Sequence, residues 1–213
     1  MNSNLTPAQA WENLKNGNQR FTSGQMLHPS QGFTRREELT VAQNPFAVIF
    51  GCADSRVAAE LIFDQGLGDV FVVRTAGHVL DTTVIGSIEY GVDLLGTPLV
   101  VVLGHDSCGA VGAAVNTLQT GQQQEGFVRA VVDRVIPSIV SITSRTGEKE
   151  FTFDANTLRN EHVKHTMSML HSYSRGIADA VAAGRCAIVG LVYDLADGQA
   201  RLVDVIGDIG EES

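Results

Sequence analysis

The sequence has few cysteines and a shortage of positive charge. Three cysteines in 213 residues are too few, and odd in number, for a disulfide framework, so metal-binding or nucleophilic roles gain weight. Fifteen Lys and Arg against 24 Asp and Glu give a formal net charge of -9, which argues against nucleic acid or an anionic membrane surface as partner. No apolar run approaches the roughly 18 residues of a membrane span, and the N-terminus lacks a signal-peptide pattern. We therefore expect a soluble cytoplasmic protein with no nucleic-acid or membrane partner.

Short hydrophobic runs rich in β-branched residues recur along the chain. Hydrophobic residues make up 44% of the sequence, which is enough for one medium-sized domain with its own core. Continuous runs of this kind are typical of parallel strands that are buried on both faces. The runs occupy residues 46–50, 70–74, 99–104 and 186–195.

Helical patterns lie between these runs, with apolar residues stepping by three and four. The predicted helices cover residues 82–96, 111–118, 126–145 and 155–183. We expect Pro137 to interrupt or kink the third of them. Asp197 and Gly198 lie between two extended segments and predict a hairpin that adds a late antiparallel strand. Strands and helices alternate, so the core is predicted to be α/β.

The N-terminal segment, residues 5–21, has the pattern of a polar helix that carries Trp11, Leu14 and Phe21. This helix could be solvated decoration. A detached amphipathic helix, however, needs another surface to cover its apolar side chains. We expect a partner subunit to supply that surface.

Cys52, His105 and Cys108 are the residues most suited to chemistry. Cys52 ends the first predicted strand, His105 ends the third, and Cys108 follows three residues later, at the start of a helix whose dipole favours a thiolate. The carboxyl ends of neighbouring parallel strands meet at the crevice where open α/β sheets bind ligands. Zinc takes Cys and His ligands, and three protein ligands leave a fourth position open for water or substrate. Cys186 or another histidine could still close a purely structural site.

Other uses of Cys52 fit the sequence less well. A cysteine phosphatase loop separates its Cys and Arg by five residues, whereas three residues separate Cys52 from Arg56. The chain has no C-x-x-C motif for dithiol redox chemistry, and its glycines match neither a dinucleotide fingerprint nor a P-loop. Asp54 is close enough to Arg56 for an ion pair. Next to a metal, Asp54 could accept a hydrogen bond from metal-bound water or bind the metal itself.

The segments "CADSR", "FVVRTAGHV", "SIEYGV" and "GHDSCG" together resemble the β-class carbonic anhydrases, and the resemblance extends over roughly residues 5–210. It implies a four-stranded parallel sheet with an added antiparallel strand, flanked by helices. It also implies a zinc-binding carbonic anhydrase domain at residues 36–213, preceded by an N-terminal helical arm at residues 1–35. The arms would clasp the partner in an obligate homodimer, which could pair further into a dimer of dimers.

The same resemblance assigns the site. Zinc would be held by Cys52, His105 and Cys108, and Asp54 and Arg56 would form the catalytic dyad beside the fourth position. Asp54 could occupy that position in a closed state. The pocket of the plant-like, always-active subtype would be formed by Gln43, Phe71, Ala76, Tyr90 and Gly109. The chain departs from the commonest pattern at Ala53, Thr75 and His78, and His78 could add a titrating group near the pocket.

The implied reaction is the reversible hydration of carbon dioxide to bicarbonate and a proton through a zinc-bound hydroxide. Two thiolate ligands would neutralise Zn²⁺, so its bound water should be less acidic than the pKa of about 7 found with three neutral histidines, and activity should rise toward alkaline pH. Two alternatives remain: hydrolysis of carbon disulfide or carbonyl sulfide on the same scaffold, and a non-catalytic zinc protein. We expect His162 and His165 on a solvated helix face, and Cys186 in the core.

Overall fold

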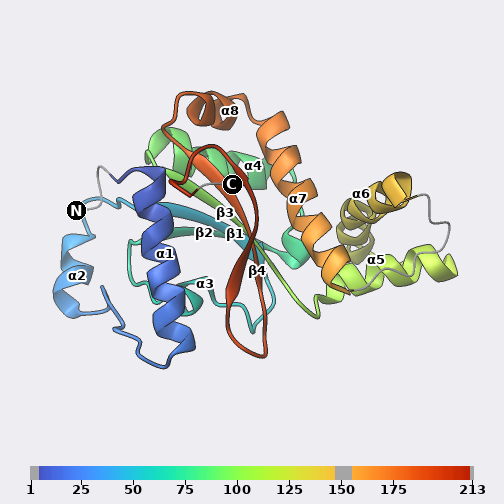
Figure 1. Ribbon diagram of the computed structural model, residues 1–213, viewed down its shortest axis with the longest axis horizontal. Helices are drawn as coiled ribbons and strands as arrows, with labels where there is room; N and C mark the ends of the chain where they lie inside the picture. Colours follow the sequence, from blue (N-terminus) through green and yellow to red (C-terminus); the bar gives the residue numbers. More distant parts are fainter. Residues whose placement is uncertain (1–4, 147–154, 212–213) are drawn as a thin grey trace.

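A five-stranded sheet runs through the centre of the molecule in the order β2-β1-β3-β4-β5 (Figure 1). The computed structural model describes residues 5–146 and 155–211. Four strands are parallel, and the fifth is antiparallel to β4, which confirms the predicted α/β fold. Every residue of β1, β3 and β4 is buried, because these strands are covered on both faces. The strands are β1 (Ala47–Cys52), β2 (Val70–Thr75), β3 (Leu99–His105), β4 (Ala187–Tyr193) and β5 (Ala200–Ile206).

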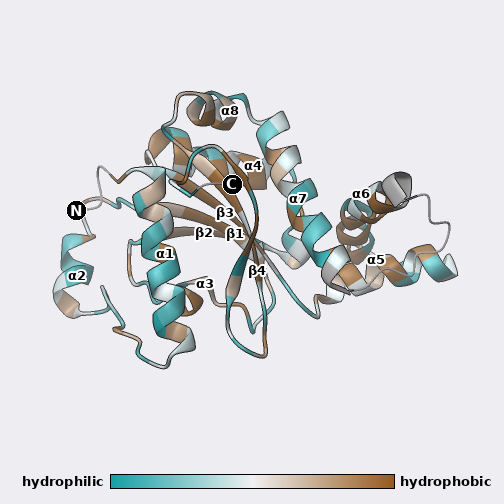
Figure 2. Cartoon of the chain, viewed as in Figure 1, coloured by the Kyte–Doolittle hydropathy of each residue, from teal (hydrophilic) through white to brown (hydrophobic). Residues whose placement is uncertain are grey.

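Helices cover the two faces of the sheet. On one face, α1 and α3 pack against alternate strand residues such as Ile49, and on the other face α4, α7 and α8 pack against residues such as Val48. Figure 2 shows the hydrophobic strands between these helices, which carry hydrophilic residues as well. The helices are α1 (Pro7–Thr22), α2 (Phe33–Glu38), α3 (Ala59–Ile62), α4 (Thr82–Glu89), α5 (Gly109–Thr120), α6 (Val128–Thr146), α7 (Ala155–Tyr173) and α8 (Arg175–Ala182), with single turns η1 (Ala76–His78) and η2 (Tyr90–Leu94).

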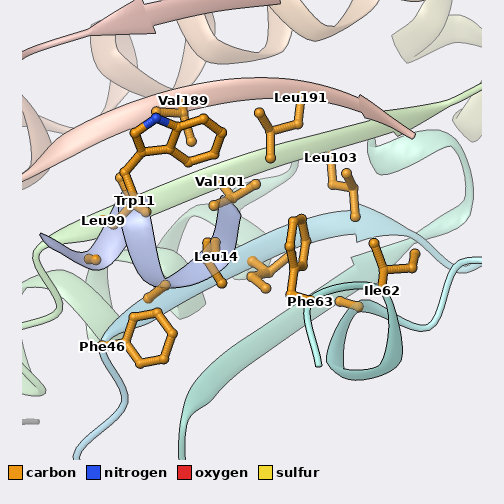
Figure 3. Packing of buried hydrophobic residues seen from close by; sticks show 14 of the residues in the cluster. Trp11, Leu14, Phe46, Ile62, Phe63, Leu99, Val101, Leu103, Val189 and Leu191 are labelled. Carbon is orange, nitrogen blue, oxygen red and sulfur yellow. The ribbon is translucent and has the colours of Figure 1, made fainter. Parts of the chain in front are cut away.

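The N-terminal helix α1 packs on the sheet of its own chain. Trp11 is 4% exposed and Leu14 is fully buried, and both belong to the same core cluster as Val101 and Val189 (Figure 3). The Trp11 indole N–H donates a hydrogen bond of 2.9 Å to Glu211 near the C-terminus. The expectation that a partner subunit covers this helix face is therefore wrong for Trp11 and Leu14. The division at residue 35 between an arm and a domain stays a prediction.

Helices α5 and α6 lie beyond the carboxyl end of β3, and they pack against the first part of α7 (Figure 1). The apolar stripe of α6 includes Val135 and Ile139, which are buried in a core cluster of their own. Helix α6 continues through Pro137. The predicted interruption at this proline is wrong, because burial of the flanking stripe outweighs the roughly 3 kcal/mol that proline costs inside a helix, while a kink at Pro137 stays a prediction.

The predicted helix over residues 155–183 is two helices that meet at Ser174. The Ser174 hydroxyl caps α8 by accepting a hydrogen bond from the Ile177 N–H, and it donates to Glu89. Along α7 a buried stripe includes His162, which is 1% exposed. The expectation of a solvated face is therefore wrong for His162, while His165 is half-buried.

The remaining expectations for the C-terminal part are confirmed. Cys186 is buried, and burial raises the pKa of its thiol to about 12, which suits an inert core position. Strands β4 and β5 form the predicted antiparallel hairpin. Their connection spans residues 194–199 and has Gly198 in a left-handed conformation with φ 74°.

Among the described helices, none has the length and apolar character needed to span a bilayer.

Candidate metal centre

Cys52, His105 and Cys108 meet at the carboxyl ends of two neighbouring strands. Cys52 is the last residue of β1, His105 is the last residue of β3, and Cys108 immediately precedes α5. One sulfur or ring nitrogen from each residue lies within 4.8 Å of the other two. Cys52 and His105 are 5% and 2% exposed, and Cys108 is half-buried. The described residues thus bring all three predicted donors to one point.

The hydrogen bonds of His105 leave one ring nitrogen free to bind a metal. Its Nδ1 lies 2.7 Å from the carbonyl oxygen of Asp106, and because a carbonyl only accepts, Nδ1 must carry the proton. Nε2 then presents a lone pair. This atom is buried and has no hydrogen-bond partner among the described residues. A buried acceptor beside two sulfurs fits a metal ligand, with Asp106 fixing the tautomer from behind.

The two sulfurs interact strongly. Hydrogen bonding with the Cys108 thiol lowers the pKa of Cys52 to about 4, and the same contact raises the pKa of Cys108. The backbone N–H of Gly77 also donates to the Cys52 sulfur, at 3.2 Å. Cys52 is therefore the stronger candidate for a thiolate even before a metal is considered.

Asp54 and Arg56 form a bidentate ion pair beside the donors. Asp54 Oδ1 accepts from Arg56 Nε at 2.9 Å, and Oδ2 accepts from Arg56 Nη2 at 2.7 Å. Oδ2 is also 4.0 Å from His105 Nε2. The Arg56 side chain, helped by the Arg56 backbone N–H, holds the pKa of Asp54 well below its usual range. Asp54 therefore remains a carboxylate at any physiological pH.

Arg74 also supports the metal centre, and the sequence analysis did not predict this role. From the exposed end of β2 its guanidinium donates to the Cys52 carbonyl at 2.9 Å and to the Asp54 carbonyl at 2.6 Å. Arg74 thus holds the backbone that carries both the first sulfur and the dyad. Its signal in the sequence was a single positive charge at the end of an otherwise apolar strand.

The five predicted pocket residues fall into two groups. Ala76 follows the end of β2 beside the Cys52 strand end, and Gly109 is the first residue of α5, next to Cys108. Gln43, Phe71 and Tyr90 lie elsewhere in the chain.

Phe71 and Tyr90 stack on each other at the outer edge of the sheet, with ring centroids 6.1 Å apart. In the sheet register Phe71 pairs with Val48 and Thr75 pairs with Cys52, so Phe71 is about 13 Å from the strand end at roughly 3.3 Å per residue. Gln43 is exposed in the segment before β1. One chain therefore does not bring these three side chains to its own metal centre.

His78 does not add a titrating group to the pocket. It is 2% exposed, and burial holds its pKa well below the usual value for histidine. Its backbone is left-handed, with φ 41°.

A cavity of about 320 Å³ reaches His105 and Cys108 from the side of α5, where Val111 and Leu158 line it.

Comparisons with known proteins agree with this geometry. The family model described as carbonic anhydrase matches residues 47–200. A carbonic anhydrase of Mycolicibacterium smegmatis is 55% identical over 208 residues, which is 98% of each chain. Among solved structures, a Coccomyxa β-carbonic anhydrase in complex with acetazolamide has a TM-score of 0.71 at 22% identity, covering 90% of this chain and 86% of that one.

A structure of tetrameric β-carbonic anhydrases from Sordaria macrospora has a TM-score of 0.67 at 20% identity, covering 79% of this chain and 85% of that one. These two structures support the fold, while the family model and the mycobacterial relative carry the assignment by sequence. With a Cys-His-Cys donor set at the strand ends of that fold, the chain belongs to the β-class carbonic anhydrases, the lyases that hydrate carbon dioxide.

Proposed function

We propose that this chain hydrates carbon dioxide reversibly to bicarbonate and a proton at a zinc ion held by Cys52, His105 and Cys108. The observation that carries the proposal is the buried, unpartnered Nε2 of His105 beside two sulfurs. Thiolate and imidazole donors in this number suit zinc and leave a fourth position open. When bound, zinc would supply Lewis-acid chemistry by lowering the pKa of a water molecule so that it can act as the nucleophile.

Asp54 is proposed to act as a fixed hydrogen-bond acceptor beside the reacting atoms. Arg56 contacts both of its carboxylate oxygens and keeps it ionised, so Asp54 can accept a hydrogen bond from a water molecule and orient it, but it takes up no proton between pH 6 and 9. In a closed state Asp54 would turn toward the metal and become its fourth ligand. That movement has to break the bidentate contact with Arg56.

The substrate pocket is proposed to need a second copy of the chain. Strand β2 is the outer strand of the sheet, and the Phe71–Tyr90 pair lies along it. A two-fold contact along β2 runs the two strands antiparallel, so the end of one β2, near its Cys52, would lie beside the start of the other, near Phe71. Phe71, Tyr90 and Gln43 of one protomer would then wall its partner's metal centre, where Ala76 and the Gly109 N–H complete the pocket.

The assembly is therefore proposed to be a homodimer, which can pair further into a dimer of dimers; the β-carbonic anhydrases from Sordaria macrospora are tetrameric. We also propose a cytoplasmic location, because a chain whose cysteines are all free and whose thiolates bind metal is best kept in reducing surroundings.

Stopped-flow measurement of carbon dioxide hydration between pH 6.5 and 9, on zinc-loaded protein, tests the proposed function. We expect fast turnover that rises with pH. Asp54→Asn should lower kcat/KM by about 10- to 100-fold, the usual effect of removing an outer partner at a metal site. Asp179→Asn, on the exposed face of α8, is the matched control and should leave the rate unchanged. Protein that binds zinc stoichiometrically and shows no turnover at any pH would overturn the proposal.

A further inference from the structure

Three buried polar side chains near the metal centre take no part in the proposed reaction. They are His78 on η1, Ser138 on α6 and His162 on α7, each no more than 2% exposed. The rings of His78 and His162 pack together with centroids 4.2 Å apart. Burying polar groups is costly unless they make specific hydrogen bonds. His162 and Ser138 meet this requirement through specific partners.

His162 contacts the turn that touches the first metal ligand. Its Nε2 lies 2.7 Å from the carbonyl oxygen of Gly77, and the N–H of the same Gly77 donates to the Cys52 sulfur at 3.2 Å. Gly77 is thus held on one side by α7 and contacts Cys52 on the other. Gly77 therefore connects His162 on α7 to the metal donor Cys52 through two hydrogen bonds.

The Gly77 turn needs such support because its backbone is unusual. Gly77 has φ 64° and ψ 20°, and His78, which is not a glycine, also has a positive φ of 41°. Conformations of this kind persist only where the surrounding structure fixes them. A side chain at Gly77 would also approach the Cβ of Ala110 to 2.6 Å, in the first turn of α5 after Cys108. The Gly77 turn is therefore packed closely between Cys52 and the start of α5, which follows Cys108.

The hydrogen bonds also determine the tautomer of His162. Because the Gly77 carbonyl can only accept, Nε2 must carry a proton. Burial lowers the pKa of His162 to about 4, so the ring is neutral and its Nδ1 is an acceptor. Ser138 Oγ lies 2.6 Å from Nδ1 and 2.9 Å from the carbonyl oxygen of Val135. Because the Nδ1 of a neutral ring protonated at Nε2 can only accept, the single hydroxyl proton of Ser138 is directed to Nδ1 at the shorter distance. Ser138 thereby favours the one tautomer in which His162 can donate to Gly77.

We propose that His162 is a positioning residue of the metal centre: it holds the Gly77 turn so that the Gly77 N–H points at the Cys52 sulfur, and Ser138 keeps His162 in the donating tautomer. The proposal rests on the zinc site described under the proposed function. A hydrogen bond to a thiolate stabilises its charge and fixes its direction. His162 therefore tunes the Cys52 ligand without touching metal or substrate.

Two variants of His162 separate hydrogen bonding from packing. His162→Leu fills the space without a donor, and His162→Gln places an amide N–H the same number of bonds from the backbone. We expect His162→Leu to weaken zinc binding by about tenfold in competition with a chelator, at the lower end of the range for outer partners of metal ligands. His162→Gln should recover most of that loss.

The cobalt-substituted protein gives a spectroscopic readout that a purely structural role would not change. Loss of the Gly77 N–H contact makes the Cys52 thiolate more electron-rich, so its charge-transfer absorption to cobalt should move to longer wavelength in His162→Leu and stay near the wild-type position in His162→Gln. Equal zinc affinities and unchanged cobalt spectra in wild type and His162→Leu would overturn the proposal. Equal losses of affinity in both variants, with unchanged spectra, would also overturn it, because they would indicate packing alone.

Ser138→Ala provides a second route if His162→Leu does not fold. It removes the donor to Nδ1, and we expect the same direction of change in affinity and spectrum. Ser141→Ala, one turn further along α6 and bonded to Glu161, is the matched control and should resemble wild type. A Ser138→Ala protein with wild-type affinity and spectrum would contradict the proposal. Wild-type protein that binds no zinc at all would overturn both this proposal and the proposed function. Variants of His162 and Ser138 with wild-type zinc affinity and cobalt spectra would overturn only this proposal.

Discussion

Helix α7 packs closely on β3 next to His105, and this packing leaves no room for a side chain at Gly104. A Cβ atom added at Gly104 would lie 2.6 Å from Val163 Cγ2, while its other nearest neighbours, His78 Cε1 and the Leu191 carbonyl oxygen, lie at 3.6 and 3.7 Å, which is ordinary contact. Gly104→Ala therefore creates one serious clash, with one methyl group. Overpacking of this kind costs about 1–3 kcal/mol, partly offset by the roughly 0.5–1 kcal/mol that alanine gains over glycine within a strand.

The clash predicts a specific coupling between the two positions. Val163→Ala removes the clashing Cγ2 together with Cγ1, so Gly104→Ala should cost little in that background, and the double-mutant cycle should give an interaction energy of about 1–3 kcal/mol. Urea unfolding of the metal-free protein at neutral pH measures all four free energies of unfolding. Because α7 also carries His162, Gly104→Ala alone should weaken zinc binding, and the double variant should regain part of it. The same destabilisation by Gly104→Ala with and without Val163→Ala would refute the reasoning.

Two further predictions concern the dyad and the N-terminal helix. The pKa of Asp54 is lowered in the folded protein, so the stabilisation it gains from Arg56 is fully present above the ordinary carboxyl pKa of 3.8 and is lost as the pH falls through the folded-state value. The difference in free energy of unfolding between wild type and Asp54→Asn should thus be constant from pH 5 to 9 and shrink at pH 3, and a difference that grows in acid would contradict this. Trp11→Ala should lower the free energy of unfolding by about 3–5 kcal/mol, because the ring is buried in the chain's own core, and calorimetry showing a loss under about 1 kcal/mol would instead place the ring outside that core.

The donor set could be predicted from the sequence because each donor follows from a local rule. Continuous β-branched runs indicated buried parallel strands, and such strands bring their carboxyl ends to one edge of the sheet. Cys52 and His105 end two of these runs, and Cys108 starts the next helix. Their convergence needed only that β1 and β3 be neighbours, and they are.

The errors arose where burial depends on which elements meet. His162 lies on a helix rich in polar and charged residues, so its spacing to His165 suggested a solvated face. It is nevertheless in phase with Leu158 and Leu170, which are buried, and that helical periodicity is the signal for a buried position. The prediction that a partner covers Trp11 is wrong because a sequence does not show which of several apolar surfaces covers a helix.

The sequence by itself determined the kind of fold, the donors and the dyad, because strand patterning, turn position and donor chemistry act over a few neighbouring residues. Only the tertiary structure decided that α1 closes its own sheet, that Arg74 holds the Cys52 and Asp54 carbonyls, and that His162 reaches Gly77. The hydrogen bonds of Arg74 and His162 join residues from 20 to 85 positions apart. Their existence depends on how separate elements pack against one sheet, and local pattern carries no information about that packing.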